Sequence, residues 1–163
     1  PADMAVELYQ SLNAVAPGIR IMLPTDSCLL GAALTPEALC STLSVKTSQL
    51  RFFFSSLSML SAHSAFFLLR ASFSIPQLLH FLRCSPSWRK NHLLETYDSV
   101  LKNGLETILN CSLSDHSWLQ ASLPVSAGGL GIRHAENLTI PTFLASYHSS
   151  LRLVESLLPV VVV

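Results

Sequence analysis

The stretch NCSLSDHSWLQASLPVSAGGLGIRHAENL, from Asn110 to Leu138, holds the densest group of residues with special backbone properties in the chain. Three glycines fall within four positions of each other, a Trp and a Gln precede them, and an Arg and a His follow. Elsewhere the sequence consists mostly of Leu, Ser, Ala and Phe. Because glycine permits positive φ and close backbone approach, the cluster predicts an irregular segment that lets Leu130 and Ile132 pack inward.

The same glycines could also form a phosphate-binding loop. A dinucleotide-binding loop needs GxGxxG between a strand and a helix, and a P-loop needs GK followed by Ser or Thr. Neither pattern occurs in GGLGIR. The residue at the end of the loop, Arg133, is compatible with a phosphate contact and equally with capping a neighbouring helix, and the sequence does not separate these two roles.

Upstream of this stretch, the chain predicts helices joined by short turns. Residues 3–16 have helical spacing of apolar residues and end at Pro17-Gly18. The runs IRIMLP and CLLG, on either side of Thr25-Asp26-Ser27, predict a β-hairpin. Thr35-Pro36-Glu37 is typical of a helix start, with Thr as N-cap and Pro in the first turn, and the helix that follows is expected to reach about Leu57.

The remaining segments are also helical in pattern. Ser61 can cap a helix over 62–74, Pro76 interrupts it, and QLLHFLRC resumes it before the Ser85-Pro86-Ser87 loop. Further helices are expected over 88–110, from the Ser114-Asp115 cap to Ser122, and from Pro141 to about Leu158. The predicted fold class is therefore mainly α, a helical bundle with a short N-terminal β-hairpin.

The composition of the chain is apolar and poor in charged residues. Half of the 163 residues are hydrophobic, only 12% are charged, and the formal net charge is zero. We expect a chain that covers part of its surface with another domain or subunit. It has no signal peptide and no clean apolar run of about 18 residues, so we expect an intracellular protein without a membrane partner. Because the chain opens without an initiator Met, we expect it to be part of a longer protein.

Neither the cysteines nor the carboxylates form a motif for chemistry. The four cysteines show no CxxC pair and no metal-ligand spacing to a His, which predicts reduced, buried thiols and no metal site. The acids are scattered singly, and Glu95 with Asp98, at i and i+3, is expected to be a solvated helix face. Adjacent residues on a helix point in different directions, so Asp115-His116-Ser117 cannot form a catalytic triad.

The charged residues are unevenly distributed. Residues 38–94 contain six Lys and Arg side chains and no Asp or Glu, whereas both flanks contain more acids than cations. Such a middle is compatible with contacts to phosphates and also with ordinary solvated side chains. Trp88, beside Arg83, Arg89 and Lys90, could stack on a base or simply pack at its loop. Trp118 and Gln120 are expected to anchor their short helix to the core.

Three segments together resemble a known family: LLGAALTPEAL (29–39), LSAHSAFFLLRASFSIPQLLHFLRCSP (60–86) and LSDHSWLQASLPVSAGGLGIRHAENLTIPTFLAS (113–146). They are similar to the C-terminal part of reverse transcriptases from non-LTR (LINE-like) retrotransposons of invertebrates. The resemblance implies that residues 1–34 are the tail of the palm subdomain and residues 35–163 the helical thumb and connection. It places Leu30 and Gly31 where the family has its primer grip.

The resemblance also implies a function: a fragment of an RNA-directed DNA polymerase that binds the RNA–DNA template–primer duplex, beside the palm and fingers of the same polyprotein. The family's catalytic YxDD-type motif lies upstream and is absent here, so the fragment is expected to have no catalytic residue and no cofactor, although the full polymerase would use Mg²⁺. The alternative is a remnant or domesticated helical protein-interaction module with no role in nucleic-acid binding. The residues expected to contact nucleic acid are Arg51, Arg70, Arg83, Trp88, Arg89, Lys90 and Arg133.

Overall fold

The computed structural model describes residues 2–18 and 22–158. Its longest central element, α2, spans Pro36–Leu57 and begins as the sequence predicts, with the Thr35 hydroxyl accepting a hydrogen bond from the Ala38 amide at 3.2 Å. The apolar residues at helical spacing, Leu39, Leu43, Leu50 and Leu57, are all buried. Helix α2 packs against α5, which spans Asn91–Leu109.

The next helical segment contains a break at the predicted position. Helix α3 (Ala62–Leu68), capped by the Ser61 hydroxyl, continues as the π-helical turn η2 (Leu69–Phe73) before α4 (Ile75–Cys84) begins. Pro76 has no amide hydrogen to donate to the carbonyl four residues earlier, and its ring crowds that carbonyl. The widened π-turn before the proline follows from this local conflict.

After α4, the short 3₁₀ turn η3 (Ser87–Lys90) leads into α5. Helix α5 ends at Asn110, which adopts the left-handed conformation that asparagine tolerates at helix ends. Helix α6 (Asp115–Ser122) starts at the predicted cap, where the Ser114 hydroxyl accepts from the Ser117 amide at 3.1 Å. The glycine-containing loop follows, with one 3₁₀ turn, η4 (Val125–Ala127).

The last helix differs from the prediction. Helix α7 spans Ala135–Leu157 and contains Pro141 in its interior, so the expectation that Pro141 starts this helix was wrong. The proline removes one backbone hydrogen bond, and the Thr142 hydroxyl donates to the Leu138 carbonyl beside the gap at 2.6 Å. Burial of Thr139 and the packing of α7 on α4 compensate for the interior proline, whose usual cost is about 3 kcal/mol.

The predicted hairpin exists, but at a different position. The strands are β1 (Cys28–Leu29) and β2 (Ala32–Ala33), paired antiparallel around Leu30-Gly31. The expected turn at Thr25-Asp26 is instead the 3₁₀ turn η1 (Pro24–Asp26), and Met22 and Leu23 form no strand. The rest of the expected first strand, residues 19–21, lies outside the described residues. Positive φ at Leu30 and Gly31 gives the tight two-residue turn that suits a hairpin.

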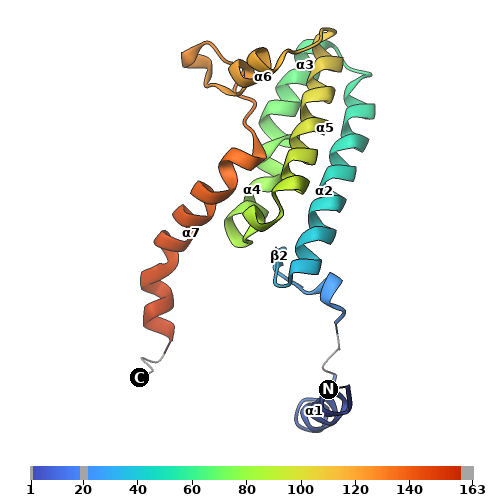
Figure 1. Cartoon of the computed structure of the whole chain (residues 1–163), viewed down its shortest axis with the longest axis vertical. Helices are drawn as coiled ribbons and strands as arrows, with labels where there is room; N and C mark the ends of the chain where they lie inside the picture. Colours follow the sequence, from blue (N-terminus) through green and yellow to red (C-terminus); the bar gives the residue numbers. More distant parts are fainter. Residues whose placement is uncertain (1, 19–21, 159–163) are drawn as a thin grey trace.

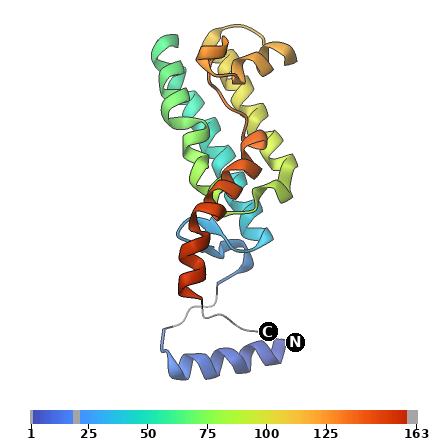
Figure 2. The same ribbon diagram turned by 90° about the vertical axis from the view of Figure 1, so that its left-hand side faces the viewer.

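The elements assemble into an elongated helical bundle. Figure 1 shows α2, α5 and the α3–α4 segment running side by side, with α6 at one end and the hairpin at the other. Figure 2 shows α7 lying across the face formed by α4, and its second half extends beyond the bundle. The fully buried Phe81, Leu94, Leu101 and Ile132 belong to the single core between these helices. The predicted class, mainly α with a short N-terminal β-hairpin, is confirmed.

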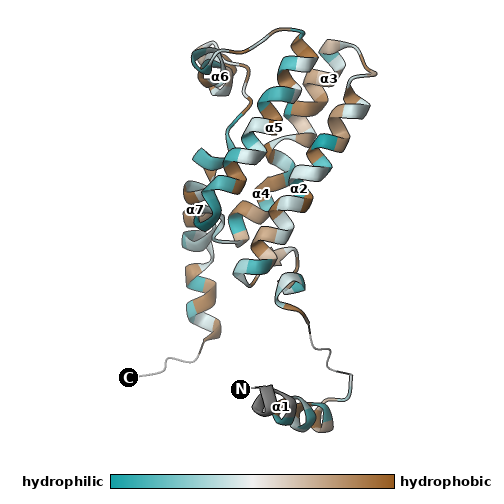
Figure 3. Ribbon diagram, turned by 45° about the vertical axis from the view of Figure 1, so that its right-hand side comes forward, coloured by the Kyte–Doolittle hydropathy of each residue, from teal (hydrophilic) through white to brown (hydrophobic). Residues whose placement is uncertain are grey.

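Several apolar side chains remain on the surface. Helix α1 (Ala2–Val15) forms as predicted, and its Leu8, Leu12 and Val15 are exposed. Hydrophobic segments are also visible on the outside of α2 and along α7 in Figure 3. These positions include Val45 and Phe52 on α2, and Leu144, Tyr147, Leu153 and Leu157 on α7.

The four cysteines lie nearer the surface than the sequence predicted. Cys28, Cys84 and Cys111 are exposed free thiols and Cys40 is partly exposed, so the prediction of buried thiols was wrong, because these residues lie at element ends or on outer helix faces.

The segment Ala62–Cys84 is long and apolar enough, by composition alone, to cross a membrane. Leu69, Leu78, Phe81 and Leu82 of this segment are buried in the core of the bundle, whereas Phe67 is exposed, and core helices of other proteins commonly have the same length and composition.

Candidate functional site

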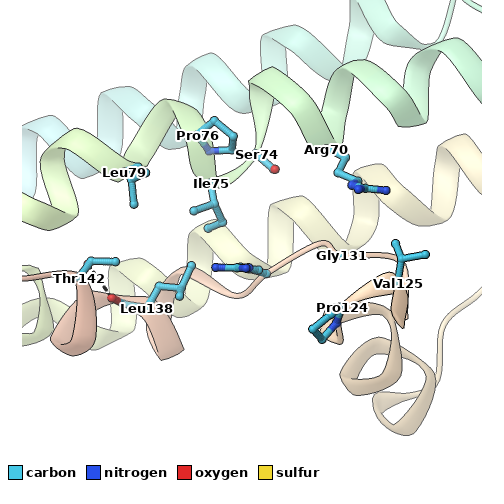
Figure 4. Close-up of a pocket in the computed structure, with 11 residues that line it drawn as sticks. Arg70, Ser74, Ile75, Pro76, Leu79, Pro124, Val125, Gly131, Leu138 and Thr142 are labelled. Carbon is cyan, nitrogen blue, oxygen red and sulfur yellow. Dashed lines mark hydrogen bonds between the residues drawn. The ribbon is translucent and has the colours of Figure 1, made fainter. Parts of the chain in front are cut away.

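A pocket opens where the break before α4, the loop after α6 and the start of α7 meet. It encloses about 410 Å³ and is lined by residues from η2, α4, η4, the glycine loop and α7. In Figure 4, Ile75 of α4 and Leu138 of α7 point toward each other across it, and Arg70 and Val125 flank it at one end. The lining residues are Arg70, Ser74, Ile75, Pro76, Leu79, Pro124, Val125, Gly131, Arg133, Leu138 and Thr142.

The wall from η2 and α4 is set by the π-turn. Arg70 lies within this turn and is exposed. The turn closes with the Ser74 amide donating to the Leu69 carbonyl at 3.0 Å, and the buried Tyr97 hydroxyl of α5 donates to the Ser74 carbonyl at 3.0 Å. Tyr97 therefore ties the backbone at the break to α5. Burial and the neighbouring Asp98 together raise the pKa of Tyr97, which keeps its phenol neutral and able to donate.

The opposite wall is the loop that follows α6. The amides of Leu130 and Ile132 both donate to the Ala121 carbonyl, at 3.1 and 3.2 Å, which folds the loop back onto the end of α6. A side chain at Gly129 would meet the Leu123 carbonyl at 2.1 Å, so only glycine fits there. Ile132 is buried and Leu130 half-buried, so the prediction that the glycines let these two residues pack inward is confirmed.

The loop ends at Arg133, and α7 begins two residues later. The carboxylate of Asp98 on α5 accepts hydrogen bonds from the Ala135 amide at 2.8 Å and the Glu136 amide at 3.1 Å. These are free amides of the first helical turn, which normally require a cap. His134 provides no side-chain cap itself, so Asp98 caps α7 from another helix and fixes the position of this pocket wall.

Asp98 was expected on a solvated face, and that prediction was wrong. Its side chain is only 8% exposed, whereas its neighbour in the expected pair, Glu95, is exposed. Burial raises the pKa of the Asp98 carboxyl above its ordinary value, while the two amide hydrogen bonds and His134 act in the opposite direction. The i, i+3 spacing gave no indication of this role, because the partner amides lie more than 30 positions further along the chain.

The electrostatic character of the pocket is positive. Two guanidinium groups line it, and among its lining residues, all within the described segment 70–142, none is Asp or Glu. A β-carbon at Gly131 would lie 3.4 Å from Nε of Arg70, so the bare backbone there lets the Arg70 side chain lie close to the loop. Guanidinium groups bind phosphate and carboxylate oxygens well, so the pocket can bind an anion.

The other predicted contact residues lie elsewhere. Arg89 and Lys90 line a smaller cleft of about 230 Å³ between the start of α2 and η3. Arg51 lines a shallow depression between α2 and α5, with Gly104 and Thr107. Arg83 is exposed in the last turn of α4. The structure thus brings together Arg70 with Arg133, and Arg89 with Lys90, while Arg51 and Arg83 share neither of these two clefts.

The two tryptophans are both engaged in packing. Trp88 is half-buried and contacts Phe143 of α7 edge-on, with ring centroids 4.6 Å apart. This contact favours packing over base stacking as the role of Trp88. Trp118 stacks on His134 at 4.5 Å and packs against the core, as predicted for an anchor of α6. Gln120, expected to share that role, is exposed, so that expectation was wrong.

The hairpin turn at Leu30-Gly31 lies over α4. The His80 ring nitrogen Nε2 is 2.9 Å from the Leu30 carbonyl oxygen, and the Ser85 hydroxyl accepts from the Ala33 amide at 2.9 Å. Leu30 is 89% exposed at the tip. The hairpin therefore projects one apolar side chain into solvent while its backbone is held to α4 and the Ser85 loop.

Comparison with known proteins identifies no relative: no family model, no curated protein and no solved structure matches this chain. Within the described ranges 2–18 and 22–158, no group of three His, Cys, Asp or Glu side chains is placed to hold a metal ion. The chemistry available to the pocket comes from its two arginines and its apolar wall.

Proposed function

We propose that this chain is the helical thumb and connection of a non-LTR reverse transcriptase, with residues 1–34 as the tail of its palm, and that it binds the backbone of an RNA–DNA template–primer duplex. One observation carries the proposal. Arg70 and Arg133, both expected to contact phosphates, come from distant parts of the sequence and line one pocket that contains no acid. Proteins hold a duplex mainly through such arginine–phosphate contacts.

Arg89 and Lys90 add a second cationic site at the hairpin end of the bundle. In this proposal, Leu30 and Gly31 project from the same end toward the primer, and the palm, which would supply the catalytic carboxylates and Mg²⁺, covers the exposed apolar face of α1. Trp88 would position Arg89 through its packing on Phe143 rather than stack on a base.

The test is binding of the full chain to a labelled RNA–DNA duplex, measured by fluorescence anisotropy across a salt series. Affinity should fall steeply with salt, and each lost phosphate contact should lower the slope of log K against log salt by about 0.7–0.9. Arg70→Gln combined with Arg133→Gln should therefore weaken binding and flatten the slope. The matched control is Arg152→Gln, which removes an exposed arginine from α7 outside the pocket. Binding that ignores salt, or equal losses in both variants, contradicts the proposal.

The alternative, a protein-interaction module, is favoured by a different observation. The second half of α7 extends beyond the bundle and exposes Leu144, Tyr147, Leu153 and Leu157. Removing Arg83, Arg89 and Lys90 together separates the two functions: it should weaken duplex binding under the first proposal and leave partner binding intact under the second. Replacing the four exposed apolar residues of α7 by polar ones should have the opposite effect: duplex binding is retained under the first proposal and partner binding is lost under the second.

A further inference from the structure

We propose that the pocket between α4, η4 and α7 also binds a small amphiphilic anion: a single phosphate or carboxylate group carried on a short apolar body. This inference concerns a free small molecule, so it does not depend on duplex binding. It rests on the mixed lining of the pocket, which combines two arginines with an apolar wall.

The anionic group is expected beside the arginines that line the pocket, Arg70 and Arg133. Both side chains line the pocket, and Gly131 leaves room for the Arg70 guanidinium beside the loop. An arginine pair without a neighbouring carboxylate lacks a partner in its immediate surroundings, and a doubly charged phosphate or a carboxylate can accept hydrogen bonds from both groups. A neutral ligand would leave these charges without a partner.

The body of the ligand is expected to be apolar because the remaining wall offers few hydrogen-bonding groups. Ile75, Leu79 and Leu138 supply hydrocarbon surface. Two of the polar groups nearby already have partners: the Ser74 carbonyl accepts from Tyr97, and the Thr142 hydroxyl donates to the Leu138 carbonyl. A nucleobase would leave its polar edge without partners, which is costly in a concave site.

The size of the ligand follows from the volume of the pocket. At about 410 Å³, the pocket is at the lower end of the range typical of small-molecule sites, which is about 300–1,000 Å³. A chain of about six carbons with one anionic group is a suitable probe. The full chain should therefore be titrated by calorimetry with inorganic phosphate, butyl phosphate, hexyl phosphate and heptanoate.

The expected result is a rise in affinity with chain length. Each methylene buried contributes about 0.8 kcal/mol, or about fourfold in Kd, so hexyl phosphate should bind roughly fifteenfold more tightly than butyl phosphate. Heptanoate compares a carboxylate with the phosphate head group, and the stated increment between butyl and hexyl phosphate supports the proposal. Equal affinities for inorganic, butyl and hexyl phosphate would overturn it, because they would indicate cationic side chains acting alone.

Three variants locate the binding. Arg70→Gln and Arg133→Gln should each lower hexyl phosphate affinity at least tenfold. Val125 is exposed at the rim of the pocket, so Val125→Glu should leave thermal unfolding unchanged and place an internal carboxylate beside the arginines, abolishing binding. Val125→Gln is its uncharged control, and Arg51→Gln controls for net charge away from the pocket. Hexyl phosphate binding that survives both the arginine variants and Val125→Glu would refute the site. A failure of duplex binding alone would not affect it.

Discussion

Gly104, in the second half of α5, lies against the Phe54 side chain of α2. It is buried, and a β-carbon built there would lie 2.0–2.2 Å from three ring atoms of Phe54 on α2. The ring therefore lies directly over the bare backbone of α5, at the contact that joins two of the longest helices. The substitution Gly104→Ala tests whether this contact or local helix propensity controls stability.

The two effects have opposite signs. In an exposed helix interior, Ala is more stable than Gly by about 1 kcal/mol. Here the added methyl group must displace the Phe54 ring or push α5 from α2, and overpacking of this kind costs about 1–3 kcal/mol. If the half-buried ring rotates outward instead, the protein loses part of the apolar burial of a phenylalanine, which is up to about 3 kcal/mol. We expect a net destabilisation of about 1 kcal/mol.

Urea unfolding followed by circular dichroism measures this change directly. In a Phe54→Ala background the obstacle is gone, so adding Gly104→Ala should stabilise the protein by about 1 kcal/mol. The control is Asn103→Ala, at an exposed position in the same turn, which should change the free energy of unfolding little or slightly increase it. A Gly104→Ala protein more stable than the wild type would refute the argument, as would the same effect in both backgrounds.

Two further predictions concern contacts that hold the pocket wall and the hairpin. Burial raises the pKa of the Asp98 carboxyl in the folded state, so the contribution of Asp98 to stability is greatest at acid pH and is lost as the carboxyl ionises. The free energy of unfolding of the wild type should therefore fall relative to that of Asp98→Asn as the pH rises from about 3 to 7. Urea unfolding at each pH measures this difference. A relative gain for the wild type over that range would show that the amide hydrogen bonds outweigh desolvation. His80→Ala removes the ring that contacts the Leu30 carbonyl, so hydrogen exchange at the Ala33 amide should accelerate. Amides in the middle of α5 should keep their protection. Unchanged exchange at Ala33 would mean that Ser85 alone holds the hairpin.

Local sequence signals determined most of the helices. Thr35, Ser61 and Ser114 each cap a helix through a hydroxyl that accepts from the amide three residues later, which is a short-range preference readable without the fold. Apolar spacing likewise predicted the buried face of α2, and the glycine cluster predicted an irregular loop. These features depend on residues within one or two turns of each other, so the sequence alone contains the information.

The tertiary structure decided what local preference could not. Pro141 lies inside α7 because Asp98, on another helix, caps the amides of Ala135 and Glu136 and starts the helix earlier than the proline would. The hairpin turn falls at Leu30-Gly31, where His80 can hold it, rather than at the polar residues that favour a turn. Arg70 and Arg133 line the same pocket because a π-turn and a folded-back loop form two of its walls. In each case the partner is remote in sequence, so its contribution exists only once the helices have packed.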